Sequence, residues 1–228
     1  MTIIRSRQAL VSCRTQLVNH VREALKSSGG RVPKGPAASF HKRASEHISE
    51  ALMPALGPIL EEIGLLTERI GDYDRRLEII SKECYPETDL LRQLEGIGPL
   101  TALTFVLTLE DPYRFEKSRS VGAYLGLVPA TDRSGDRDPQ RRISKEGEEM
   151  LRKLLVSSAH YILGPFGSDS DLRRHGEKIA SRGAKNAKKR AAVAVARKLC
   201  VLLHRLWVTG EVYDPLYNAH RRQEKEAA

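Results

Sequence analysis

A regular spacing of apolar residues most constrains how this 228-residue chain can fold. Steps of four and three residues alternate without a fault through Leu52, Leu56, Ile59, Ile63, Leu66, Ile70, Tyr73, Leu77, Ile80 and Cys84. An apolar residue every 3.5 residues on average is typical of a helix that packs along a narrow seam on another helix. The spacing therefore predicts one long helix with a coiled-coil contact. Its partner is either a helix of the same chain or a second copy, and the second case predicts a homo-oligomer.

The rest of the chain also has a helical pattern. Residues 3–28 carry apolar side chains at amphipathic spacing, and the glycines and prolines of residues 27–36 then break the helix. Little period-two alternation occurs anywhere. We expect an all-α fold, with long coiled-coil helices followed by a compact helical domain that has a helix-hairpin-helix element. The expected divisions are an N-terminal helix and linker (1–36), the coiled coil (37–88), a C-terminal domain (89–217) and a polar tail (218–228).

A surplus of positive charge indicates an anionic partner. The chain has 38 Lys and Arg against 29 Asp and Glu, a formal net charge of +9, which favours nucleic-acid binding. No acidic residue occurs between Lys178 and Gly210. We predict phosphate contacts by the cations that open this stretch; a solvated basic face is the alternative. These cations are Lys185, Lys188, Lys189 and Arg190.

Membrane, disulfide and metal-binding signals are weak. No apolar run reaches the length of a membrane span, and the first residues lack the apolar core of a signal peptide. The three cysteines are far apart in the sequence and do not pair with histidines at zinc spacing. We therefore expect a cytoplasmic protein with free thiols, no metal site and no cofactor of its own.

A glycine pair marks a second candidate phosphate site. Gly96 and Gly98 bracket the apolar Ile97, and Pro99 suits the first position of a following helix. A helix that begins there has unpaired N–H groups, which bind phosphate well. The pattern resembles the helix-hairpin-helix element of DNA-binding proteins, which grips the DNA backbone without reading sequence. A simple helical hairpin is the alternative.

Residues 130–147 form a charged segment between two apolar ones. Ser134 stands before Gly135, and the cations around it are Arg133, Arg137, Arg141, Arg142 and Lys145. Arginines can neutralise the non-bridging oxygens of a phosphodiester under attack by a hydroxyl. Taken by itself, a Ser-Gly pair in a charged loop is typical of an ordinary turn.

Several ordered motifs together resemble one family. They are Gly96-Ile97-Gly98, Arg114-Phe115, the segment 123–129 (AYLGLVP), Ser134-Gly135, Ile143-Ser144-Lys145 with Gly147, and Leu151-Arg152. The set resembles the C-terminal domain of the insertion-sequence-110 family of bacterial transposases, most strongly over residues 90–160.

That resemblance implies a DNA recombinase guided by a structured RNA. Members join a serine covalently to DNA, and this serine maps onto Ser134. Their N-terminal RuvC-like domain holds Mg²⁺ on an Asp-Glu-Asp-Asp set. No such segment precedes Met1, so we expect Mg²⁺ only with a separate RuvC-like domain as partner, and a nucleoid-associated location.

Two other interpretations stay open at this point. The chain could be a catalytically inactive module for DNA binding and dimerisation, left by a truncated element. It could also be a Holliday-junction-binding or repair factor that shares only the hairpin. The Ser-Gly and Ile-Ser-Lys matches argue against this last interpretation.

Overall fold

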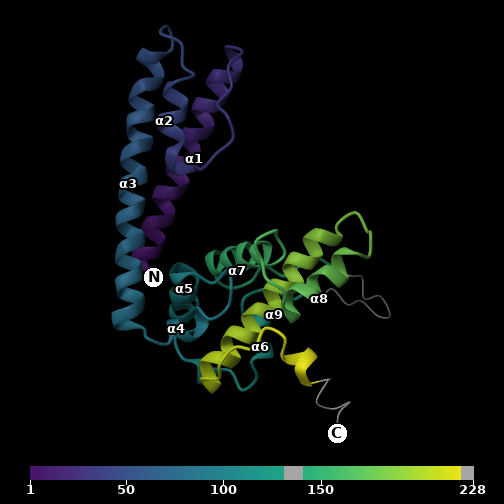
Figure 1. Ribbon diagram of the computed structural model, residues 1–228. Helices are drawn as coiled ribbons and strands as arrows, with labels where there is room; N and C mark the ends of the chain where they lie inside the picture. Colours follow the sequence, from purple (N-terminus) through teal and green to yellow (C-terminus); the bar gives the residue numbers. More distant parts are fainter. Residues whose placement is uncertain (131–140, 222–228) are drawn as a thin grey trace. The chain divides into compact units, whose positions relative to one another are not determined.

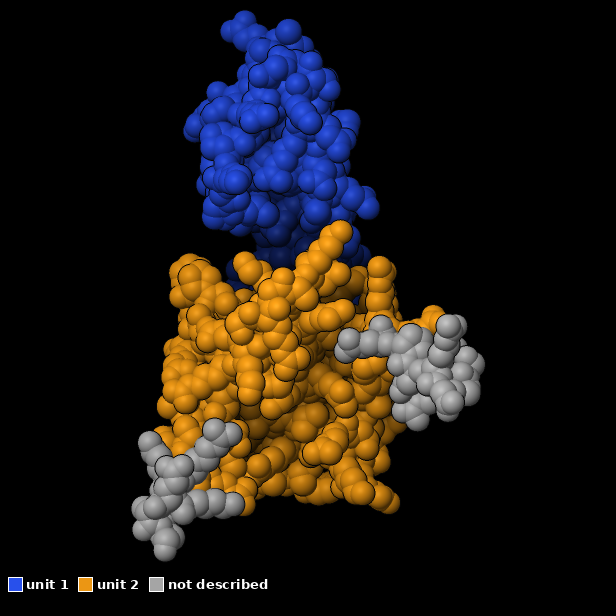
Figure 2. All heavy atoms as spheres, turned by 90° about the vertical axis from the view of Figure 1, so that its right-hand side faces the viewer, with its two compact units in different colours: residues 1–80 blue, residues 81–228 orange. Residues whose placement is uncertain are grey.

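The computed structural model describes residues 1–130 and 141–221. These residues form helices joined by turns, with no β-strand among them, so the all-α prediction is confirmed (Figure 1). In chain order the elements are α1 (Thr2–Ser27), η1 (Ala37–Ser39), α2 (Phe40–Ser45), α3 (Met53–Cys84), α4 (Thr88–Leu91), α5 (Pro99–Leu109), η2 (Pro112–Arg114), α6 (Arg119–Tyr124), α7 (Glu149–Ile162), α8 (Asp171–Ala180) and α9 (Ala187–Thr209). The chain divides into two compact units, residues 1–80 and 81–228 (Figure 2).

Unit 1 is built on an antiparallel pair of helices, α1 and α3. Arg7 Nε lies 2.5 Å from Asp74 Oδ1, and Arg14 Nη1 donates to Thr67 Oγ1 over 3.2 Å. The residue numbers of both pairs add up to 81, so the two helices run in opposite directions in one fixed register. The polar pairs lie beside the seam, where they fix its alignment.

The predicted seam of α3 is the core of unit 1. Leu56, Ile63, Leu66 and Ile70 are buried, while Cys84 at its end is exposed. Val18, Val21 and Leu25 of α1 and Phe40 and Ala44 of α2 pack with the first part of the seam. The long helix is confirmed, and its partner is α1 of the same chain. A homo-oligomer through this seam stays a prediction, and it would require α1 to leave the seam.

The central helix of unit 2 is α9, which packs on α4, α6, α7 and α8. Its buried residues recur at steps of three to four over five turns, including Ala191, Val195, Leu199 and Leu203. Such a broad apolar face lets one helix be covered from several sides. Cys200 lies in the same core, and burial raises the pKa of its thiol to about 12.

The Gly-Ile-Gly turn has an apolar plug, as the sequence predicts. Ile97 is buried, Gly98 caps α5 and Pro99 is its first residue. The helix before the turn, α4, is only four residues long and is followed by turns. The predicted helix-hairpin-helix element is therefore not confirmed, because one of its two arms is a single helical turn.

Candidate nucleic-acid interface

Two short segments pair beside the charged region and form what we call the stem, residues 126–130 and 141–145. Ala130 N donates to Arg142 O over 2.8 Å, Ser144 N to Val128 O over 2.9 Å, and Lys145 N to Gly126 O over 3.1 Å. These bonds hold together the two chain ends that flank residues 131–140. The predicted Ser134, Arg133 and Arg137 lie in that segment, outside the described residues.

Two glycines allow the backbone around the stem to pack closely. Gly126 has φ +63° and Gly147 φ +75°, where L side chains are strained. A Cβ on Gly126 would lie 2.7 Å from the carbonyl carbon of Lys145 and nearer still to Glu146 N and O. A Cβ on Gly147 would overlap the carbonyl oxygen of Tyr124. Only glycine fits at either position without moving the main chain.

Arg152 bridges the two residues that directly adjoin the stem. Its side chain is buried, and Nη1 donates to Leu125 O over 3.1 Å and to Glu146 O over 2.7 Å. A buried guanidinium that satisfies two carbonyls fixes both chain segments at once. The motif residues Gly126, Gly147 and Arg152 thus act together to stabilise the stem.

The stem forms one edge of an open groove in unit 2, with a volume of about 1820 Å³, which we call the basic groove. The other edges come from α6, α8, α9 and residues 211–221. Among the described residues, eleven Lys and Arg line it: Arg119, Arg141, Arg142, Lys145, Arg182, Lys189, Arg190, Arg197, Lys198, Arg205 and Arg221.

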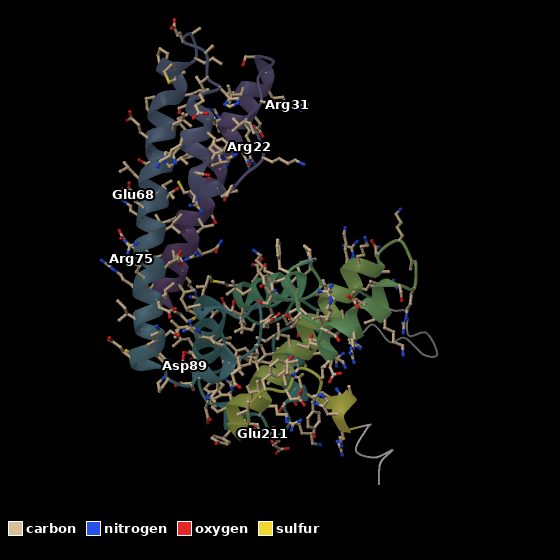
Figure 3. All side chains as sticks on the ribbon, viewed as in Figure 1. Arg22, Arg31, Glu68, Arg75, Asp89 and Glu211 are labelled. Carbon is tan, nitrogen blue, oxygen red and sulfur yellow. The ribbon has the colours of Figure 1, made fainter. Side chains whose placement is uncertain are left out.

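Three carboxylates of the part of the chain that the structure describes also line the basic groove, and each has a polar partner. Asp171 Oδ2 accepts from Asn218 Nδ2 over 2.7 Å, Glu211 pairs with Arg205 over 2.9 Å, and Asp214 contacts His220 over 2.9 Å. Figure 3 labels Glu211, just beyond the C-terminal end of α9. With eleven cations against three carboxylates, the groove has a strongly positive potential.

His175 of α8 lines the groove and responds to that potential. Its pKa lies below the usual value, first because the ring is partly buried and then because Lys198, Arg182 and Lys178 are close. Each nearby positive charge opposes protonation of the imidazole. The groove therefore favours anions over further cations.

The predicted site residues separate into two groups. Arg141, Arg142, Lys145, Lys189 and Arg190 line the basic groove together, although the stem and α9 are far apart in the sequence.

The other described candidates lie elsewhere in unit 2. Lys185 and Lys188 are exposed but are not among the residues that line the groove. Gly96 and Gly98 do not line it either. Gly96 packs against α7, where a Cβ would lie 3.0 Å from Tyr161 Cδ1, whereas a Cβ on Gly98 would meet no atom within 4 Å.

Sequence reasoning missed several cations of the groove, namely Arg119, Arg197, Lys198, Arg205 and Arg221. A signal for part of this set was present. Arg190 and Arg197 are seven residues apart, as are Lys198 and Arg205, and residues seven apart lie on one face of a helix. Extending the basic face along the whole of α9 would have identified Arg197 and Arg205.

Metal-ligating side chains do not cluster in the parts of the chain that the structure describes. No group of three or more His, Cys, Asp or Glu there is arranged to hold a metal ion. Likewise, no helix within residues 1–130 and 141–221 is long and apolar enough to cross a membrane.

Comparisons with known proteins identify the family. Residues 88–169 match the model of the transposase IS116/IS110/IS902 family. The chain is 31% identical over 219 residues to the transposase for insertion sequence element IS1111A of Coxiella burnetii, a match that covers 92% of this chain and 59% of that protein. A probable family 20 transposase of Pseudomonas aeruginosa is also 31% identical, over 92% of this chain and 64% of its own length.

A third relative extends the same picture. The transposase for insertion sequence element IS1328 of Yersinia enterocolitica is 29% identical, over 92% of this chain and 63% of its own length. The chain thus spans about three fifths of the length of these relatives. Residues 88–169 belong to the IS116/IS110/IS902 family of transposases, and nearly the whole chain is similar to these transposases.

Proposed function

We propose that this chain is a DNA-binding part of an insertion-sequence transposase, and that its basic groove binds phosphates of the DNA backbone. The observation that carries the proposal is the gathering of eleven cations, all among the described residues, from five parts of unit 2 around one groove. Phosphate contacts release condensed counterions, so such a groove gains affinity for any DNA sequence. The family supports DNA as the polymer, because transposases act on DNA.

We further propose that Ser134 is the nucleophile that joins the protein to DNA. Its Oγ attacks a phosphodiester phosphorus, the new Oγ–P bond forms, and the bond from phosphorus to one deoxyribose oxygen breaks. The proton that the serine loses is balanced by the one that the released deoxyribose hydroxyl gains. One phosphodiester replaces another, so the reverse reaction can rejoin the strand.

The stem supports this assignment. Ser134 follows Ala130 by four residues, a stretch that spans at most about 14 Å. Arg141 and Arg142, in the opposite segment of the stem and level with Ala130, line the basic groove. They are suited to neutralise the non-bridging oxygens as negative charge builds up on the phosphate. Arg133 and Arg137, beside the serine in the sequence, have the same proposed role.

The donor set of the described residues does not fit a magnesium site. They offer no cluster of carboxylates and histidines, so no step of the proposed reaction uses a metal that they hold. Our proposal assigns Mg²⁺ to a separate RuvC-like domain, with a structured guide RNA and a second copy of the chain as further partners.

The N-terminus of α5 is proposed as a second phosphate contact, away from the basic groove. Gly98 has open space where a Cβ would stand, so a phosphate can approach the first N–H groups of an 11-residue helix. Gly96 contributes by holding the turn against α7. Lys185 and Lys188, exposed before and at the start of α9, add a non-specific attraction.

A covalent adduct is the test of the serine assignment. The chain is incubated with nicked and branched DNA and Mg²⁺, alone and with a family RuvC-like domain and guide RNA added, and resolved on a denaturing gel. We expect an adduct that Ser134→Ala abolishes and that the control Ser144→Ala retains. No adduct in any arm, with DNA binding intact, would replace the proposal with a non-catalytic binding module.

A further inference from the structure

We infer that the basic groove takes an unpaired segment of DNA, with a base stacked on Tyr217, in preference to a duplex. This inference rests on the proposed function, that the groove binds DNA. It adds which form of DNA enters and which side chains receive the bases.

The groove has an apolar floor beneath its cations. Ten of the eleven lining cations are exposed, whereas the apolar lining residues Leu127, Leu172, Val193, Val201 and Leu202 are buried or half-buried. A duplex presents phosphates and sugars outward and keeps its base faces stacked inside. Unpaired bases expose flat apolar faces, which gain from contact with an apolar surface. A floor of this kind therefore favours a single strand.

Tyr217 supplies a stacking surface at the edge of the groove. The residue is 42% exposed, and the Arg205 guanidinium lies 5.5 Å from its ring centroid. Arg205 is itself held by Glu211 at 2.9 Å. The arginine orients the ring and leaves ring surface open to solvent, so a base can stack there without first ordering the side chain.

The backbone on either side of Tyr217 is also fixed. Asn218 donates to Asp171 Oδ2 through both its backbone N, over 2.8 Å, and its Nδ2, over 2.7 Å. Asp171 N donates in turn to Pro215 O over 2.8 Å. A rigid aromatic presented to solvent beside a row of cations matches the two needs of a single strand, which are stacking for bases and charge for phosphates.

Tyr213 contributes a second aromatic ring with a neutral phenol. Its backbone N donates to Gln93 Oε1 over 2.9 Å. Burial, followed by the nearby carboxylates of Asp171, Asp214 and Glu95, raises the pKa of the phenol to about 12. The hydroxyl therefore stays uncharged at neutral pH and can donate a hydrogen bond to a base or phosphate.

Binding measurements with matched oligonucleotides test the inference. Fluorescence anisotropy compares a single-stranded DNA, the corresponding duplex, a duplex with an unpaired tail, and an RNA of the same sequence. The variants are Tyr217→Ala, Tyr217→Phe and, as control, Tyr113→Ala, because Tyr113 is 73% exposed and does not line the groove. Unfolding midpoints verify that each variant is folded.

We expect tighter binding of the single strand and the tailed duplex than of the blunt duplex. Tyr217→Ala should weaken single-strand binding about fivefold or more, with Tyr217→Phe and Tyr113→Ala close to the native chain. Ultraviolet crosslinking of DNA that contains 5-iododeoxyuridine should label Tyr217 or Tyr213 in the native chain. This second readout stands even if Tyr217→Ala fails to fold.

Several results would overturn the inference. They are duplex binding at least as tight as single-strand binding, equal effects of Tyr217→Ala and Tyr113→Ala, or a clear preference for RNA. A parallel variant, Lys189→Gln with Lys198→Gln, separates this failure from that of the proposed function. If it weakens all DNAs while Tyr217→Ala has no effect, the groove binds DNA without stacking; if it has no effect, the groove is not the DNA site.

Discussion

The close backbone packing at Gly126 leads to a stability prediction with a built-in control. Gly126→Ala places a methyl group where the main chain of residues 145–146 already lies, whereas Gly183→Ala introduces the same group at φ +71° with no atom within 4 Å. Both substitutions incur the left-handed backbone penalty of about 1–2 kcal/mol. Only Gly126→Ala also forces main-chain movement.

The extra cost follows from the contact distances. A Cβ at 2.7 Å from Lys145 C, and nearer to Glu146, must move apart by several tenths of an ångström to about 1 Å to reach an ordinary contact of at least 3.4 Å. Overpacking of this kind costs about 1–3 kcal/mol. We therefore expect Gly126→Ala to lose about 2–5 kcal/mol of unfolding free energy and Gly183→Ala about 1–2 kcal/mol.

Urea unfolding, monitored by tryptophan fluorescence, measures the difference in unfolding free energy between the two variants. The single tryptophan, Trp207, lies in unit 2 and packs 6.3 Å from the Phe105 ring centroid, so it reports on the unit that contains both glycines. Equal losses for the two variants, within about 0.5 kcal/mol, would refute the close packing of the stem.

Four further predictions can be tested on the same preparations. Arg152→Leu leaves the carbonyls of Leu125 and Glu146 unpaired and should cost about 2–4 kcal/mol in urea unfolding, against under about 0.5 kcal/mol for the exposed Lys153→Ala. Because the pKa of His175 is lowered by folding, the unfolded chain binds more protons just below about pH 6.5; stability should rise with pH up to that point, and His175→Gln should remove the rise. The buried Cys200 should resist iodoacetamide until the chain unfolds, whereas the two exposed cysteines react in the native state, as mass spectrometry would show. Arg190→Ala should reduce the slope of log Kd against log salt by about one in anisotropy titrations.

Helices and their apolar faces were predictable from the sequence because both depend on local spacing. The seam from Leu52 onward predicts a long helix, and α3 confirms it. Its partner was not predictable, since α1 and a second copy of the chain both offer a matching apolar stripe. The choice depends on a fixed register, to which the pairs of Arg7 with Asp74 and Arg14 with Thr67 contribute.

The basic groove was predictable only in part, for a similar reason. Charge excess identifies cations such as Arg142 and Lys189, but it does not say which of them face one another. That depends on the stem, on the packing of α8 against α9, and on Asp171 fixing the segment around Asn218. The family resemblance singled out the glycines of the motif, but their steric role could be recognised only from contacts in the three-dimensional structure.

Charge removal inside and outside the basic groove tests the central claim most directly. Lys189→Gln with Lys198→Gln removes two exposed lysines that line the groove, and Lys185→Gln with Lys188→Gln removes two exposed lysines that do not. The net charge changes equally, so the comparison isolates position. If the groove holds DNA, the first pair should lower DNA affinity about tenfold or more in anisotropy titrations at moderate salt, and clearly more than the second pair. Equal losses of DNA affinity for both pairs would mean that binding depends only on the overall charge of the protein. This result would contradict the assignment of the groove as the DNA site.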